Sequence, residues 1–176
     1  MGRLLRKPLT WVVVVVVVAG SAVGLALFEP WRAFTSSRVD EPVPAAATAT
    51  DATDATDATT PPKPEVLAEG RFVSQEHDTS GTAQVLRLPD GKRILRLTGF
   101  STSDGPDVHV WLTTTKAGAD EHAYDDSRHI ALGELKATDG NHNYAIPAGA
   151  KLEGLRSAVI WCDRFNVAFG SAPLAL

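Results

Sequence analysis

Cys162 is the residue of this sequence with the clearest capacity for redox chemistry, and it is the only cysteine among 176 residues. A single cysteine excludes an intramolecular disulfide, a C-x-x-C redox pair, a C-x-x-C-H haem attachment site and a cysteine-rich zinc site. Two uses of the side chain stay open: a thiol that takes part in chemistry, or a small hydrophobic group packed in the core. Alternation along its predicted strand places Cys162 on one face with Ala158 and Ile160, opposite Trp161.

Asp107 and His109 form a second group with chemical potential, because they follow the turn-forming pair Gly105-Pro106 at the start of a predicted strand. They share one face of that strand with Trp111, and such a polar and aromatic face could form one wall of a site. The structural alternative is the solvent face of a half-buried strand, with Asp107 accepting backbone N–H bonds that lock the turn. We take Asp107 and His109 as weaker candidates for the same site as Cys162.

The remaining histidines are dispersed along the chain: His77, His122, His129 and His142. No two of them have a spacing typical of metal ligands, so we predict no metal site. His122 lies in a polar, Asp-rich stretch, 117–127, that we interpret as an exposed loop. A blue-copper centre is disfavoured because no histidine follows Cys162 and the one methionine is Met1. The G-x-S-x-G, P-loop and G-x-G-x-x-G motifs are absent from the sequence, so no hydrolase, kinase or dehydrogenase is indicated.

The composition of the chain excludes a nucleic-acid partner. The formal net charge is −4 and the pI is near 5.7, with Lys and Arg scattered along the sequence. No basic face is therefore available to neutralise phosphates. A length of 176 residues suffices for one domain with one hydrophobic core.

Residues 11–28 form an uninterrupted stretch without a charge, and they predict a transmembrane helix. At about 1.5 Å per residue the helix would span about 27 Å, close to the ~30 Å of the lipid hydrocarbon core, so the bilayer is its expected partner. Because Arg3, Arg6 and Lys7 precede it, residues 1–10 are expected to be cytoplasmic. We thus expect a single-pass protein of the cell membrane whose C-terminal domain is extracytoplasmic. A cleaved signal peptide is the alternative interpretation.

Residues 29–66 are expected to be a disordered linker. They are rich in Ala, Thr, Pro and Asp, and three Asp-Ala-Thr triplets run from 51 to 59. Such a composition offers too little apolar surface to offset the entropy lost on ordering.

Residues 67–176 are predicted to form one β domain. Short alternating segments recur with turn signals between them, such as Pro89-Asp90-Gly91-Lys92, and no segment has a sustained helical period. The prediction is an all-β sandwich or flattened barrel of about nine short antiparallel strands. The expected strands include 70–75, 81–88, 93–98, 107–113, 130–135, 143–146, 157–163 and 166–169.

The β region resembles the DM-thirteen domain family over essentially all of residues 68–176. The segments that carry the resemblance are Asp104-Gly105-Pro106-Asp107-Val108-His109-Val110-Trp111-Leu112, 140–147 and 157–174, with Gly70-Arg71-Phe72, His77, Gly81-Thr82-Ala83 and Phe100 in support. The chain looks like a membrane-anchored, bacterial-type member. The resemblance implies a β-rich fold, electron transfer with a redox partner, and a hallmark cysteine, here Cys162, acting as a bare thiol or as a ligand to a group such as haem.

Two functions follow as hypotheses. The first is a membrane-tethered, extracytoplasmic domain for electron transfer or thiol or cofactor redox chemistry centred on Cys162. The second is a cofactor-free binding or structural β-sandwich at the cell surface, in which Cys162 is a core residue and a surface protein is the partner.

Overall fold

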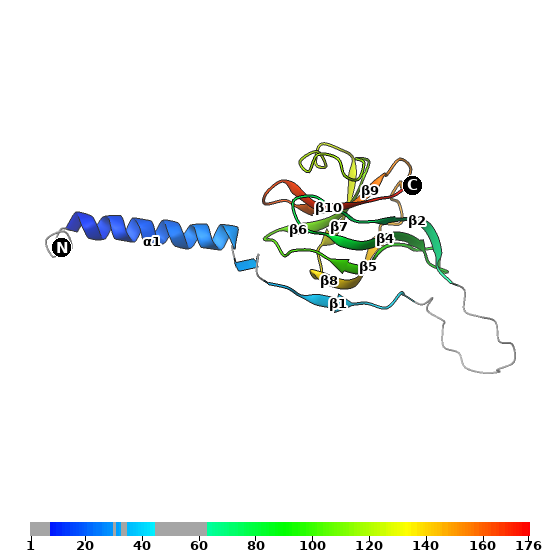
Figure 1. The fold of residues 1–176 in the computed structure, drawn as a ribbon, viewed down its shortest axis with the longest axis horizontal. Coiled ribbons are helices and arrows are strands. Elements are labelled where there is room, and N and C mark those ends of the chain that lie inside the picture. The colour runs from blue at the N-terminus through cyan, green and yellow to red at the C-terminus, as the bar shows by residue number, and fades with distance from the viewer. Residues whose placement is uncertain (1–7, 30, 33–34, 45–62) are drawn as a thin grey trace, which may run out of the picture.

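The computed structural model describes residues 8–29, 31–32, 35–44 and 63–176. Within these residues the chain forms one long helix and ten strands in two five-stranded sheets (Figure 1). The elements are α1 (Pro8–Phe28), β1 (Arg38–Asp40), β2 (Glu65–Arg71), β3 (Val73–Ser74), β4 (Ser80–Arg87), β5 (Arg93–Ser101), β6 (Val108–Thr113), β7 (His129–Glu134), β8 (Asp139–Ile146), β9 (Ser157–Cys162) and β10 (Val167–Pro173).

Helix α1 is long and apolar enough to cross a membrane. Its 21 residues have a mean hydropathy of 2.6 in the most apolar window, and none of them is buried. A helix of this length spans about 32 Å, which matches the hydrocarbon core. Figure 1 shows it projecting from one end of the β domain.

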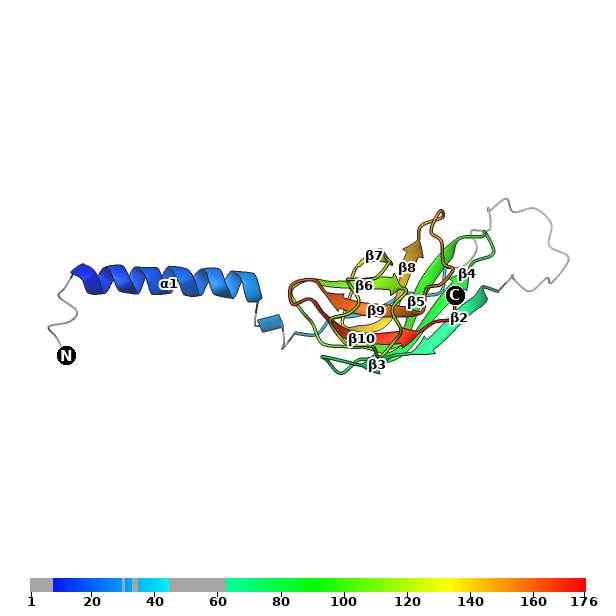
Figure 2. The ribbon, with the colours of Figure 1, turned by 90° about the horizontal axis from the view of Figure 1, so that it is seen from above.

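The two sheets pack face to face as a sandwich, and they do not close into a barrel (Figure 2). The first sheet has the order β1-β8-β5-β4-β2 and the second has the order β3-β10-β9-β6-β7. All pairs are antiparallel except β1 with β8, which is parallel. The predicted all-β sandwich is confirmed, although it has ten described strands rather than about nine.

Strand β1 lies within 29–66, the stretch that the sequence predicts to be a disordered linker. It pairs with β8 through Val39 and Gly140, and Glu41 just beyond it accepts hydrogen bonds from Lys136 Nζ and from the N–H of Asn143 at 2.7 and 2.6 Å. Three residues of mixed polarity carry no strand signal of their own, so the free edge of β8 determines this strand. The rest of the predicted linker, 45–62, lies outside the described residues.

The core lies between the inner faces of the two sheets, and a smaller cluster lies on the outer face of the second sheet. Every residue of β9 is buried, because the inner core covers one face and the segment between β6 and β7 covers the other. Tyr124 of that segment is completely buried. The segment 117–127, interpreted from the sequence as an exposed loop, exposes Asp120, His122, Asp125 and Asp126, but Tyr124 ties it to the sheet.

Candidate functional site

Cys162 is the last residue of β9 and lies on the inner face of the second sheet. It pairs in register with Val108 of β6 and Val167 of β10, and it belongs to the inner core together with Ala158 and Ile160. Its exposure is 0%. The predicted strand face is confirmed, and the thiol has no direct access to solvent.

Backbone N–H groups gather around the sulfur where β6 begins and β9 ends. Burial raises the pKa of the Cys162 thiol and the Asp107 carboxylate adds to the rise, while the nearby backbone N–H groups of Phe165, Arg164 and Asp107 act in the opposite direction. The N–H of Asp163 donates to the carbonyl of Asp107 at 2.9 Å and joins the same two strand ends. The turn then closes with Asn166 at φ 54°, a conformation that asparagine tolerates better than most residues. The thiol is therefore protonated at neutral pH.

Haem ligation by Cys162 does not fit this arrangement. A haem ligand needs an open approach to the sulfur, whereas the inner-face neighbours of Cys162 are core side chains such as Val108, Val167 and Phe169. Two hollows between described residues at this end of the domain are lined by residues other than Cys162. The haem expected from the resemblance has no place at Cys162 in this conformation.

Asp107 and His109 come together on the outer face of the same sheet. His109 Nε2 lies 2.9 Å from Asp107 Oδ1 and 3.5 Å from Asp163 Oδ2. All three side chains keep access to solvent, with His109 the least exposed at 22%. The structure therefore places the predicted residues at one end of the sheet but on opposite faces, with Cys162 inside and His109 outside.

Asp163 is a member of this group that sequence reasoning missed. The signal was present, because Asp163 follows Cys162 and alternation puts it on the Trp161 face. Its proximity to Asp107 depends on the register of β6 with β9, in which His109 pairs with Trp161. That register is not readable from either strand alone.

A stack of aromatic rings covers the outer face beside these residues. The rings of Trp111 and Trp161 stack with centroids 5.1 Å apart, and His129 stacks on Trp111 at 4.1 Å. Tyr124 packs against Trp161 at 6.4 Å and donates its hydroxyl hydrogen to Ser171 Oγ at 3.0 Å. The stack connects the residue next to Cys162 with the surface at His129, which is exposed.

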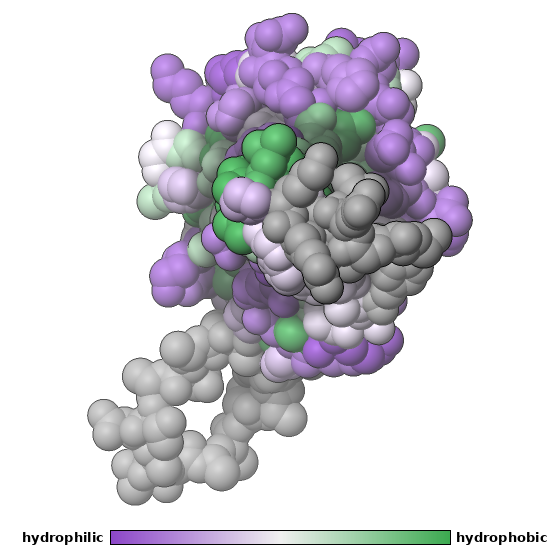
Figure 3. All heavy atoms as spheres, turned by 90° about the vertical axis from the view of Figure 1, so that its left-hand side faces the viewer, coloured by the Kyte–Doolittle hydropathy of each residue, from purple (hydrophilic) through white to green (hydrophobic). Residues whose placement is uncertain are grey.

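The helix joins the domain at the end that holds Cys162. Phe28 stacks on Phe165 of the β9–β10 turn, and Arg32 Nη1 donates to the carbonyl of Gly105 at 3.1 Å and pairs with Asp104 at 3.4 Å. An apolar hollow of about 300 Å³ lies at this junction, lined in part by Phe28 and Phe165. Figure 3 views the molecule from the helix side and shows hydrophobic side chains gathered near the helix axis, with hydrophilic ones around the rim.

His77, His122 and His142 lie apart from the cluster of Asp107, His109 and Asp163. His122 Nδ1 is 2.7 Å from the carbonyl of Asn166, and His77 packs on Phe169 with ring centroids 4.0 Å apart. His142 is fully buried on the inner face of β8, where Nε2 lies 3.0 Å from the carbonyl of Asp139. Within the described part of the chain, its Nδ1 has no hydrogen-bond partner. Burial lowers the pKa of His142.

Comparison with known proteins gives one match. The model of the family described as Electron transfer DM13 matches residues 71–174, which include every strand from β3 to β10. No curated protein and no solved structure matches the chain.

Proposed function

Because the chain belongs to the electron transfer DM13 family, we propose that it is a membrane-anchored electron-transfer protein in which Cys162 is the redox group. The observation that carries the proposal is the position of the thiol. It lies inside the family-matched segment, at a strand end where three backbone N–H groups partly offset the rise in thiol pKa that burial causes. An ordinary core cysteine needs no such surroundings.

The proposed redox step is a one-electron oxidation of the thiol. Cys162 gives one electron to a one-electron acceptor held at or in the membrane and releases the thiol proton, for which the Asp107 carboxylate is a nearby base. Reduction returns the electron and the proton. The Trp161–Trp111 stack leads from the neighbour of Cys162 to the exposed His129, away from the helix end, so we propose it as the route to a second redox partner and not to the membrane acceptor.

The place of the helix supports a partner at the membrane. Phe28 ends the apolar helix and touches Phe165, three residues after Cys162, so the end of the domain that holds the thiol faces the bilayer. We propose further that the domain is extracytoplasmic, because Arg3, Arg6 and Lys7 precede the apolar stretch. Lys92→Cys, at the far end of the domain, should react with a membrane-impermeant maleimide on intact cells whose outer layers are permeable to the reagent. Labelling only after lysis would reverse the orientation.

Protein-film voltammetry of the full chain in detergent tests the redox proposal. We expect a reversible wave in the wild type that disappears in Cys162→Ser. Ala158→Ser is the matched control, because Ala158 lies on the same inner face of β9 with 0% exposure and gains the same buried hydroxyl. A buried hydroxyl without a partner costs about 1–3 kcal/mol, so both variants should lose similar stability while the control alone keeps the wave.

A second candidate function is favoured by the complete burial of Cys162. In that case the sandwich is a cofactor-free binding or structural module and the thiol only fills the core. A wild type without a redox wave, whose thiol resists alkylation until the domain unfolds, would support this function and overturn the redox proposal. A wave that survives in Cys162→Ser would place the redox group elsewhere in the chain.

A further inference from the structure

Asp107, His109 and Asp163 each direct one ligand atom into a common space, and these atoms all lie within 4.8 Å of one another. We propose that this cluster binds a divalent first-row transition-metal ion. No metal-ligand spacing marks these residues along the chain, because they come from two strand ends more than fifty positions apart. The proposal does not require a redox role for Cys162, whose sulfur lies on the opposite face of the sheet from His109; Asp107 is the residue that both proposals use.

The backbone holds the three ligands in place. Asp107 directly precedes β6, His109 lies within it, and Asp163 directly follows β9. The two strands are neighbours in the sheet, and the hydrogen bond of 2.9 Å from the N–H of Asp163 to the carbonyl of Asp107 ties their ends together. Ligands on paired strands need little reorganisation on binding, unlike ligands on free loops.

The separations of the ligand atoms are those of neighbouring ligands on one ion. Metal–ligand bonds of about 2.0–2.2 Å place two adjacent ligand atoms about 3.0–3.5 Å apart. His109 Nε2 lies 2.9 Å from Asp107 Oδ1 and 3.5 Å from Asp163 Oδ2. On binding, the carboxylates of Asp107 and Asp163 would move closer to each other. The two negative charges repel each other, but each would be attracted to a cation placed between them.

The residues around the cluster favour a cation, and a polar hollow beside Asp107 is open to solvent. Glu134 of β7 pairs in register with His109, which adds a third carboxylate on this side of the sheet. Asp107 and Glu134 both line a polar hollow of about 340 Å³. The two cations that line the same hollow are already paired, Arg32 with Glu29 and Asp104, and Lys136 with Glu41.

The donor set selects the class of metal. One imidazole nitrogen with two carboxylate oxygens suits borderline ions such as Zn²⁺, whereas Ca²⁺ and Mg²⁺ prefer oxygen ligands alone and Cu⁺ prefers sulfur. Three protein ligands leave at least one coordination position open. The site is therefore suited to an ion that also binds water or a small ligand.

Calorimetric titration of the full chain in detergent with Zn²⁺ tests the site. We expect one ion per chain, and at least a tenfold weaker affinity in His109→Gln and in Asp163→Asn. His122→Gln is the matched control, because His122 is a surface histidine with an acidic neighbour, 3.9 Å from Glu121, and lies outside the cluster. Its removal should leave the affinity unchanged.

Two further measurements distinguish this site from oxygen-only and sulfur-containing metal sites. Titration with Ca²⁺ should show binding at least tenfold weaker than with Zn²⁺. Titration with Co²⁺ should give visible bands of nitrogen and oxygen ligation without a sulfur-to-cobalt charge-transfer band. The assignment is overturned by the absence of a one-to-one Zn²⁺ complex, by equal losses in His109→Gln and His122→Gln, by equal Ca²⁺ affinity, or by a sulfur band that makes Cys162 a ligand.

Discussion

The ring of Phe28, the last residue of the apolar helix, stacks on the ring of Phe165 in the β9–β10 turn, with centroids 6.2 Å apart and planes inclined by 18°. Phe165 nevertheless remains 48% exposed. A large apolar side chain that touches the end of a membrane-spanning helix lies at the level of the membrane interface. If the helix spans a bilayer, as we propose, the β9–β10 turn is the part of the domain nearest to it, and Cys162 lies directly before this turn.

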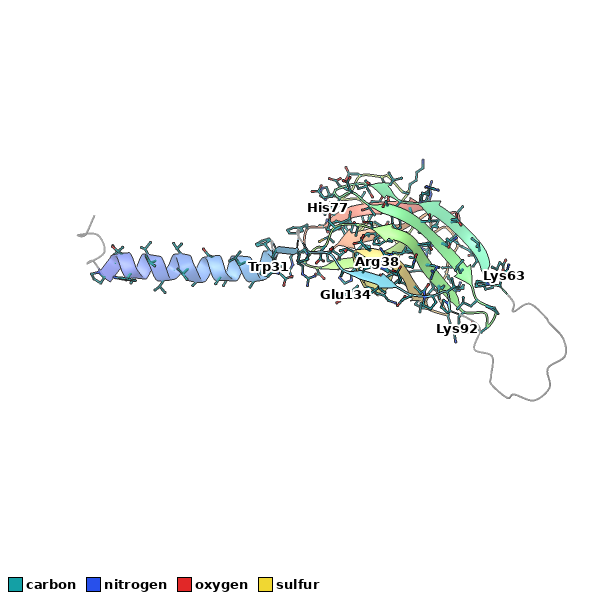
Figure 4. All side chains as sticks on the ribbon, turned by 60° about the horizontal axis from the view of Figure 1, so that its bottom comes forward. Trp31, Arg38, Lys63, His77, Lys92 and Glu134 are labelled. Carbon is teal, nitrogen blue, oxygen red and sulfur yellow. The ribbon has the colours of Figure 1, made fainter. Side chains whose placement is uncertain are left out.

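The first prediction follows from this contact. In a Cys162→Ser background, an environment-sensitive fluorophore attached at Phe165→Cys should report an apolar surrounding when the full chain is reconstituted in phospholipid vesicles. The same fluorophore at Lys92→Cys, at the opposite end of the domain, should report water (Figure 4). Lipid-soluble quenchers placed in the bilayer should reduce only the first signal.

The outcome decides how the domain sits on the membrane. Equal spectra and equal quenching at the two positions would mean that the domain tumbles freely at the end of its tether. The end of the domain that holds Cys162 would then not face a partner in the membrane.

The second prediction concerns the attachment of β1. Gly140 has φ of +111°, and a Cβ at this position would collide with the carbonyl of Val39. Gly140→Ala should therefore detach β1 from β8, in addition to the backbone strain of about 1–3 kcal/mol that a positive φ imposes on alanine. Trypsin cleavage after Arg38 should become at least tenfold faster.

Gly133 offers the matched control for the strain. Its φ is +123°, yet a Cβ at this position would meet no atom within 4 Å. Gly133→Ala should lose similar stability without exposing Arg38. Equal cleavage rates in both variants would show that β1 does not depend on its contact with Gly140.

Alternation in the sequence predicts which side chains share a face of a strand. It does not predict which residues of different strands meet in the site. The inner face of Cys162 with Ile160 and the outer face of His109 with Trp111 follow from the period of two along β9 and β6. The proximity of Asp163 to His109 depends on the register between β6 and β9. The sequence alone does not give that register, so Asp163 could not be assigned to the site of His109. Strand β1 was missed for a related reason, since its pairing is determined by β8 rather than by its own three residues.

The third prediction concerns acid stability through His142. Burial lowers the pKa of this histidine below its ordinary value of 6.5, so the unfolded chain takes up its proton first as the pH falls. The contribution of neutral His142 is present above pH 6.5 and is lost as the pH falls toward the folded-state pKa. Urea unfolding should show that the wild type loses stability below about pH 6.5 faster than His142→Gln, which can still donate to the carbonyl of Asp139.

His122 supplies a control of opposite sign. Its hydrogen bond with the carbonyl of Asn166 raises its pKa, so its contribution is present in acid and is lost as the pH rises. His122→Gln should therefore lower stability in acid relative to neutral pH. If His142→Gln and His122→Gln shift the acid limb in the same direction, the assignment of the buried histidine is wrong.

The last prediction concerns alkaline stability through Cys162. Burial raises the pKa of the thiol above its ordinary value of 9.0, so the unfolded chain loses this proton at lower pH than the folded chain. The difference in unfolding free energy between the wild type and Cys162→Ala should stay constant below about pH 8.5 and then fall, by at most about 1.4 kcal/mol per pH unit. Burial also raises the pKa of Tyr144 to about 12, but that residue is present in both proteins and cancels. Urea unfolding between about pH 7 and about pH 10.5 measures the difference.

A difference in unfolding free energy that stays level over this range would mean that folding leaves the thiol pKa unchanged. A difference that grows with pH would mean that the three N–H groups outweigh burial and that the folded protein favours the thiolate.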